Sequence, residues 1–111
     1  MNTEELILKF WNSWQQPADW NEMRSCLADD YQFDAGMFKC SNGDEAVAIA
    51  QMGNPWKEVE LLDMICKEDH AAIIYQGIDI NSGAQFRVSE FLKIKDRKIT
   101  GGFGVVTQLP A

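Results

Sequence analysis

The chain has 111 residues, of which 46% are hydrophobic, and it carries a formal net charge of −7. This size predicts a single domain over residues 1–111, and the apolar content is sufficient for a core without disulfides or a structural metal. A protein that follows a nucleic-acid backbone needs a positively charged face. The acidic balance therefore argues against nucleic acid as a partner.

Cysteine and histidine usage limits the chemistry further. The three cysteines, Cys26, Cys40 and Cys66, show no CxxC spacing, and the single histidine, His70, leaves too few soft ligands for a zinc site. We expect neither a metal nor a cofactor. Reduced thiols fit a cytoplasmic protein. The acidic start of the chain is unlike a secretory signal, and no apolar run approaches the roughly 20 residues of a membrane span.

The first half of the chain shows helical patterns. Asn2 with Glu5 resembles an N-terminal capping pair, and apolar residues then recur at helical spacing on a helix of about a dozen residues. Pro17 is the predicted end of this helix. Asp19 is the predicted start of a second, shorter helix.

One short strand and a third helix are expected next. Residues 31–35 alternate in polarity, which predicts the strand. Ser41 with Asp44 resembles another capping pair, and Gly53 followed by Pro55 predicts the end of the helix.

The second half predicts four antiparallel strands joined by tight turns. The expected strands are 57–66, 71–80, 84–95 and 99–106. The loop 81–83 ends in a glycine, as three-residue hairpin loops require. Gly101, Gly102 and Gly104 lie inside the last strand, where glycines usually mark a bend, a bulge or close packing.

The clearest alternation in the chain surrounds Glu90. Val88 and Leu92 share its face, whereas Phe91 lies on the opposite face among cationic residues. Burial of an unpaired carboxylate costs several kcal/mol, so we expect Glu90 to be protonated, paired or facing water inside a pocket. A structural salt bridge to Arg87 or to a lysine on a neighbouring strand is the alternative.

Three segments carry a resemblance to a known group of proteins: LADDYQFD at 27–34, GDEAV at 43–47 and EFLKIKDRKI at 90–99. With the order of elements, they resemble the nuclear transport factor 2-like (NTF2-like) superfamily, in particular its SnoaL-like and ketosteroid isomerase-like branch. Family members often have glycine where Arg97 stands. The resemblance implies an α+β fold of the cystatin-like roll type, with helices first and a four-strand meander last. A cone-shaped, curved antiparallel sheet would wrap round the long first helix and enclose an apolar pocket.

The isomerase branch uses a base on the first strand, a tyrosine, and a protonated carboxylic acid. Carried onto this chain, Glu90 stands at the position of the acid, and Asp34 stands one residue before the position of the base, which is Ala35. The resemblance thus implies Glu90 and Asp34 as catalytic candidates, but the first helix has no tyrosine. Alternation turns Asp34 away from the face of Phe33 and Ala35. A strand-end aspartate bonded to the backbone of the Gly36 turn is the alternative.

The candidate ligand contacts are Trp11, Trp14, Phe33 and Tyr75. In the implied cone, one face of the first helix is both core and pocket wall, so its tryptophans fit either role. Tyr75 lies within an apolar strand, where its hydroxyl would orient a ligand or bond to Glu90.

Two functions fit these features. The first is a non-catalytic module that binds a small apolar ligand and forms a homodimer through the outer face of the sheet, near Phe91. The second is a cofactor-independent isomerase, cyclase or dehydratase in which Glu90 is the acid and Asp34 or water is the base. The missing tyrosine and the displaced Asp34 favour the first.

Overall fold

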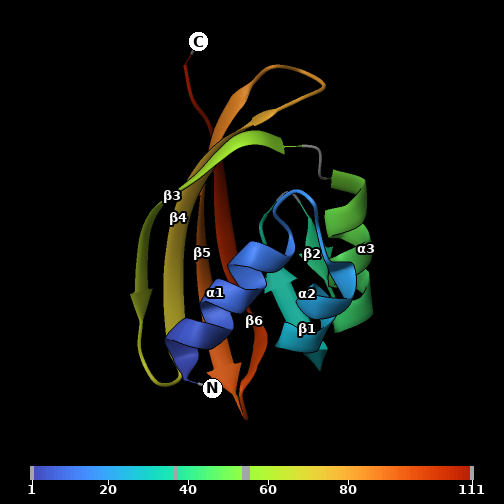
Figure 1. Ribbon diagram of the computed structural model, residues 1–111, viewed down its shortest axis with the longest axis vertical. Coiled ribbons are helices and arrows are strands. Elements are labelled where there is room, and N and C mark those ends of the chain that lie inside the picture. Colours follow the sequence, from blue (N-terminus) through green and yellow to red (C-terminus); the bar gives the residue numbers. More distant parts are fainter. Residues whose placement is uncertain (1, 37, 54–55, 111) are drawn as a thin grey trace.

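The computed structural model describes residues 2–36, 38–53 and 56–110, within which three helices and six strands form one α+β body (Figure 1). None of the helices in these ranges is long and apolar enough to cross a membrane. The elements are α1 (Thr3–Ser13), α2 (Trp20–Cys26), β1 (Leu27–Asp34), β2 (Lys39–Cys40), α3 (Gly43–Gly53), β3 (Trp56–Cys66), β4 (His70–Asp79), β5 (Gln85–Lys95) and β6 (Lys98–Gln108).

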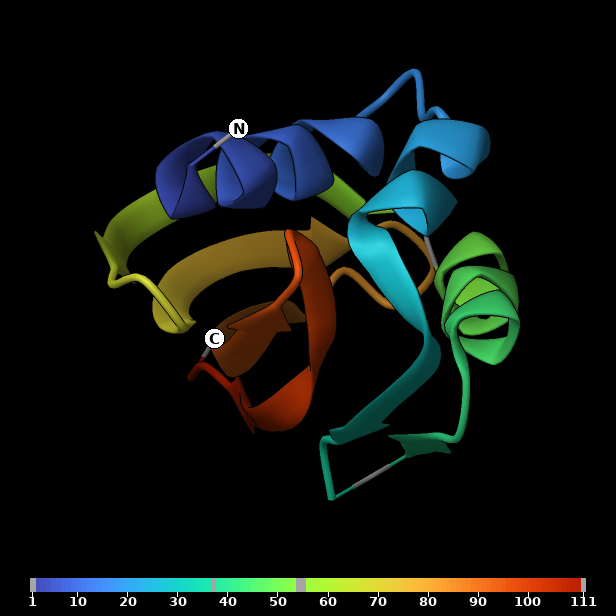
Figure 2. The same cartoon turned by 90° about the horizontal axis from the view of Figure 1, so that it is seen from below.

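The strands form one sheet in the order β2-β1-β6-β5-β4-β3. The predicted meander is confirmed, because β3, β4, β5 and β6 pair in antiparallel fashion with their chain neighbours. β1 lies parallel to β6, and the short β2, which the sequence did not predict, pairs with β1. Figure 2 shows that the sheet curves and that α1 lies along its concave side, as the resemblance implied.

The first two helices begin where their capping residues predict. The side chain of Asn2 accepts a hydrogen bond from the Glu5 amide at 2.8 Å, and Asp19 accepts one from the Glu22 amide at 3.1 Å. Helix α1 ends at Ser13, before the predicted stop at Pro17.

The start of α3 differs from the prediction. Asn42, not Ser41, accepts a hydrogen bond from the Glu45 amide at 2.8 Å, and Glu45 accepts one from the Ser41 amide at 3.1 Å. The capping residue is therefore Asn42, because it directly precedes the first helical turn, and the Glu45 side chain bonds back to the amide of the residue before Asn42. The predicted helix stop Pro55 lies outside the described residues.

Two glycines in β6 allow it to lie tightly between β1 and β5. A β-carbon at Gly101 would stand 1.9 Å from the carbonyl oxygen of Gln32, and one at Gly102 would stand 1.8 Å from that of Phe91. Both glycines have positive φ, 140° and 154°. The expectation that glycines here mark close packing is confirmed, because no other residue fits these positions.

Arg97, where the resemblance implied a glycine, lies in the turn between β5 and β6. Its φ is 61°, in the left-handed region that costs a side-chain-bearing residue roughly 1–2 kcal/mol. The preceding Asp96 also has a positive φ, 53°. The turn thus adopts the glycine-type conformation without a glycine.

The core joins α1 to the concave face of the sheet. Its fully buried apolar side chains include Ile7 of α1, Leu27 of β1, Ile73 of β4, Leu92 of β5 and Ile99 of β6. This packing holds α1 against the curved sheet and leaves a space beside the helix.

Candidate functional site

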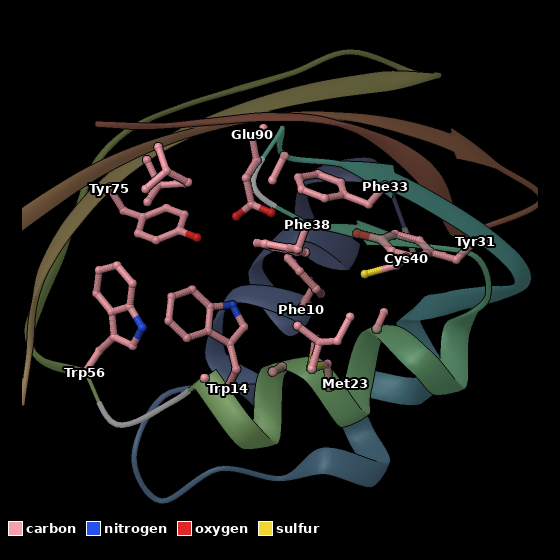
Figure 3. Close-up of a pocket in the computed structure, with 18 residues that line it drawn as sticks. Phe10, Trp14, Met23, Tyr31, Phe33, Phe38, Cys40, Trp56, Tyr75 and Glu90 are labelled. Carbon is pink, nitrogen blue, oxygen red and sulfur yellow. The ribbon is translucent and has the colours of Figure 1, made fainter. Parts of the chain in front are cut away.

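A cavity of about 330 Å³ opens between the concave face of the sheet and the three helices (Figure 3). Its volume lies at the lower end of the roughly 300–1,000 Å³ typical of small-molecule sites. Most of the wall is apolar. The aromatic side chains in the lining are Phe10, Trp14, Tyr31, Phe33, Phe38, Trp56 and Tyr75.

Glu90 projects from β5 into this cavity. Its neighbours on the same face of the strand, Val88 and Leu92, are buried, and Glu90 itself is only 8% exposed, as the alternation predicts. Directly opposite on β6 stands Gly104, which has no side chain to fill the space beside the carboxyl group. Among the described lining residues, Glu90 is the only one with a charged side chain.

Tyr75 donates its phenolic hydrogen to the Glu90 carboxylate. Tyr75 pairs with Val88, two residues before Glu90, so the two side chains are diagonal neighbours on one face of adjacent strands. Burial raises the pKa of Glu90 to about 7, and the hydrogen bond from Tyr75 opposes part of that rise. Burial also raises the pKa of Tyr75, and the nearby Glu90 charge adds to this effect.

Tyr31 of β1 lies on the opposite side of the cavity from Tyr75, with its hydroxyl directed into the cavity (Figure 3). It is only 4% exposed, and its pKa is raised, first by burial and then by the negative charge of Glu90. The sequence analysis missed Tyr31. The signal was available, because Tyr31 precedes Phe33 by two residues on one strand and must therefore share its inward face.

Two glycines in the sheet let aromatic rings approach it closely. A β-carbon at Gly104 would stand 2.7 Å from the Cζ atom of Phe33, and one at Gly77 would stand 2.7 Å from the Cε3 atom of Trp56. These close contacts fix the positions of Phe33 and Trp56, which line different parts of the pocket.

Asp34, the candidate base, does not line this pocket. Its carboxylate accepts a hydrogen bond from the Gly36 amide at 2.8 Å and lies 3.8 Å from the Nζ atom of Lys39. The alternation along β1 turns Phe33 inward and Asp34 outward, so the structure does not bring the two candidate carboxylates together.

The remaining candidates divide between pocket and core. Trp14 lines the pocket, whereas Trp11 lies behind it and packs edge-on against Trp14 and Tyr75, with ring centroids 4.8 Å and 5.0 Å apart. Trp11 therefore supports the wall without forming its surface. Arg87, the alternative partner of Glu90, bonds to Gln76 at 3.1 Å on the other face of the sheet.

The polar groups of this pocket allow only a few kinds of chemistry. One carboxyl group with a pKa near neutrality and two phenols face an otherwise apolar space. Such a site can hold one polar group of a small molecule or move one proton. In the parts of the chain that the structure describes, no three His, Cys, Asp or Glu side chains are grouped so that they could hold a metal ion.

Comparison with known proteins identifies the fold. No protein-family model matches the sequence, and no curated protein matches it either. Solved structures do match. A proposed ketosteroid isomerase from Kribbella flavida has a TM-score of 0.83 at 13% identity, and the match covers 98% of this chain and 80% of that one. An NTF2-like protein of unknown function from Mesorhizobium loti has a TM-score of 0.79 at 18% identity, covering 95% and 90%.

The fold is thus that of the NTF2-like superfamily, as the sequence implied. A third neighbour extends the range of activities found on it: an LEH-like epoxide hydrolase from Mycobacterium tuberculosis, with a TM-score of 0.75 at 18% identity, covering 93% of this chain and 80% of that one. At such identities the likeness concerns the fold alone, so the function must be argued from the pocket.

Proposed function

We propose that this chain binds a small, largely apolar molecule in the cavity under its sheet. The observation that carries the proposal is the pair of Glu90 and Tyr75 in the wall of an otherwise apolar space of about 330 Å³. An apolar pocket with a few convergent polar groups is the usual form of a small-molecule site, in which the apolar wall supplies affinity and the polar group fixes orientation.

Blocking the cavity tests this proposal. Ala50 of α3 lines the pocket, whereas Ala48 of the same helix is exposed to solvent. Ala50→Phe should abolish the binding of compounds found by calorimetric and tryptophan-fluorescence screening of an apolar library, and the matched variant Ala48→Phe should bind as the wild type does. Unchanged affinity in a folded Ala50→Phe protein would place the binding elsewhere.

A second candidate is proton-transfer catalysis of the isomerase, cyclase or dehydratase type. It is favoured by the pKa of Glu90, about 7, because a group that titrates near the working pH can both donate and accept a proton. Since Asp34 lies outside the pocket, Glu90 would have to perform both transfers or share them with water. Glu90→Gln should then remove turnover on any substrate that is found, and a variant with full turnover would exclude this function.

We also propose a homodimer formed through the outer face of the sheet. Phe91 and Phe103 are cross-strand partners there and are 54% and 56% exposed, and Val105 nearby is 58% exposed. Exposed apolar patches of this kind often mark interfaces. Sedimentation at micromolar concentration should show a dimer that Phe91→Ser weakens, while Ile80→Ser, at an exposed apolar position in the hairpin after β4, should leave it intact. A monomeric wild type would exclude the dimer.

We also propose a cytoplasmic location, on the basis of the cysteines. The three cysteines are free, and two of them, Cys26 and Cys40, are buried. Free thiols suit a reducing compartment. Fractionation of cells that express the tagged full chain tests this location, and recovery from an oxidising compartment would contradict it.

A further inference from the structure

The charges around Glu90 indicate which polar group a ligand of this pocket should carry. The described lining contains no lysine, arginine or histidine, so no protein cation neutralises the carboxylate. Arg87 and Lys93, the nearest basic residues along β5, both lie on the opposite face of the sheet, where Arg87 bonds to Gln76 and the Nζ atom of Lys93 lies 5.8 Å from the centre of the Phe103 ring. An ionised carboxylate without a cationic partner is unfavourable in an apolar space, and a ligand that brings a positive charge would remove this cost.

Tyr75 stabilises the ionised form of Glu90, against the larger effect of burial. Tyr75 donates a hydrogen bond to the carboxylate, and the Tyr31 hydroxyl points into the same space from β1 (Figure 3). A phenol that donates to a carboxylate stabilises the anion. The carboxylate retains further lone pairs for a second donor, because two oxygens together offer about four acceptor sites.

The aromatic wall points to the same ligand chemistry. Seven of the described lining side chains are aromatic, and they surround a single acidic group. Aromatic faces attract cations, and aromatic cages recognise ammonium groups in this way. The net charge of −7 on the whole chain adds a weaker, long-range attraction of the same sign.

We infer that the ligand of this pocket is a lipophilic amine, whose ammonium group pairs with Glu90 and whose hydrocarbon body fills the aromatic space. This inference rests on the proposed function, because it names the class of molecule that occupies the same cavity. An anionic ligand would face an unshielded carboxylate. A neutral carbonyl ligand would require Glu90 to take up a proton before it could donate to the ligand, and an alcohol would donate only an uncharged, weaker hydrogen bond to the carboxylate.

Three compounds with one rigid hydrocarbon cage test the inference: adamantylamine, adamantanol and adamantanecarboxylate. At about pH 8, titration calorimetry should show that the amine binds roughly tenfold or more tightly than the alcohol, because a charge-assisted hydrogen bond is about twice as strong as a neutral one. The carboxylate should not bind. In Glu90→Gln, which keeps the shape of the side chain, the ratio of amine to alcohol affinity should fall to about one.

A matched control separates the pocket from the overall charge. Glu60→Gln removes one negative charge from an exposed position on β3 and should preserve the preference for the amine. If Glu60→Gln lost the preference as Glu90→Gln does, or if Glu90→Gln kept it, the pairing with Glu90 would be refuted. Circular dichroism of each variant establishes that it is folded.

The pH dependence provides a second readout. The titratable groups that face Glu90 are Tyr75 on β4, Tyr31 on β1 and Cys40 on β2, and burial raises the pKa of each, so they stay protonated near neutrality. The lining residues from α1, α2, α3, β3 and β6 carry no ionisable side chain. Amine affinity should therefore rise between about pH 5.5 and about pH 8.5 as Glu90 ionises, and this rise should vanish in Glu90→Gln.

The outcomes are distinguishable. If the alcohol binds as tightly as the amine, or if amine affinity falls as the pH rises, the inference is overturned and the small-molecule function stands. If none of the three compounds binds to the wild type, although the cage is small enough for the cavity, both the inference and the proposed function are refuted.

Discussion

Replacement of Glu90 by glutamine should make the protein more stable at neutral pH and should leave it almost unchanged in acid. Burial raises the pKa of this carboxyl group from 4.5 in the unfolded chain to about 7 in the fold. The folded state therefore favours the protonated form, and the stability associated with this group is fully present below about pH 4.5 and is lost as the pH rises through 7. A shift of this size corresponds to about 3 kcal/mol, since one unit is about 1.4 kcal/mol.

Urea unfolding monitored by tryptophan fluorescence measures this difference, because urea carries no charge and does not screen the carboxylate. The free energy of unfolding of Glu90→Gln minus that of the wild type should increase by about 3 kcal/mol between about pH 4.5 and about pH 8. Glu60→Gln, with its exposed side chain, should show almost no change in the same difference. A constant difference for Glu90→Gln over this range would refute the view that Glu90 is buried without a compensating cation.

Three further variants test other parts of the structure. In Gly77→Ala the new β-carbon would stand 2.7 Å from Trp56, so the ring must shift, and ligand affinity measured by calorimetry should fall about tenfold without loss of folding. Tyr75→Phe removes a donor to Glu90 and should move the carboxyl titration, followed by carbon-detected NMR, up by about one unit; a downward shift would contradict the assigned hydrogen bond. Arg97→Gly should raise the free energy of unfolding by up to about 1 kcal/mol, and lower stability would show that the left-handed turn is not strained.

The sequence was sufficient for the three helices, for the strands other than β2, and for the face on which Glu90 lies, because all of these depend on local patterns. Alternation along one strand determines which side chains point inward, and it placed Glu90 and Phe33 in the interior. The same alternation places Tyr31 in the interior beside Phe33, whereas the resemblance implied a pocket tyrosine on the first helix. The alternation of side chains along a strand was thus a better guide to the pocket residues than the catalytic roles that the resemblance implied.

What the sequence could not supply depends on contacts between distant segments. Trp11 and Trp14 both fit an apolar helix face, and only the packing of α1 against β4 shows that Trp14 forms the surface of the pocket. The short β2 has no local signature, since it exists only through its pairing with β1. The start of α3 was displaced by one residue because Ser41 and Asn42 are both good capping residues.

The parallel pairing of β1 with β6 has a consequence for how the protein forms in the cell. Leu27 near the start of the chain pairs with Ile99 near its end, so Tyr31 reaches Glu90 only after almost the entire polypeptide has left the ribosome. Until then the edge of β1 that pairs with β6 has no partner strand, and joining such remote segments is slow. The pocket should therefore be among the last features to form during synthesis. Chains that end before β6 should be prone to aggregate.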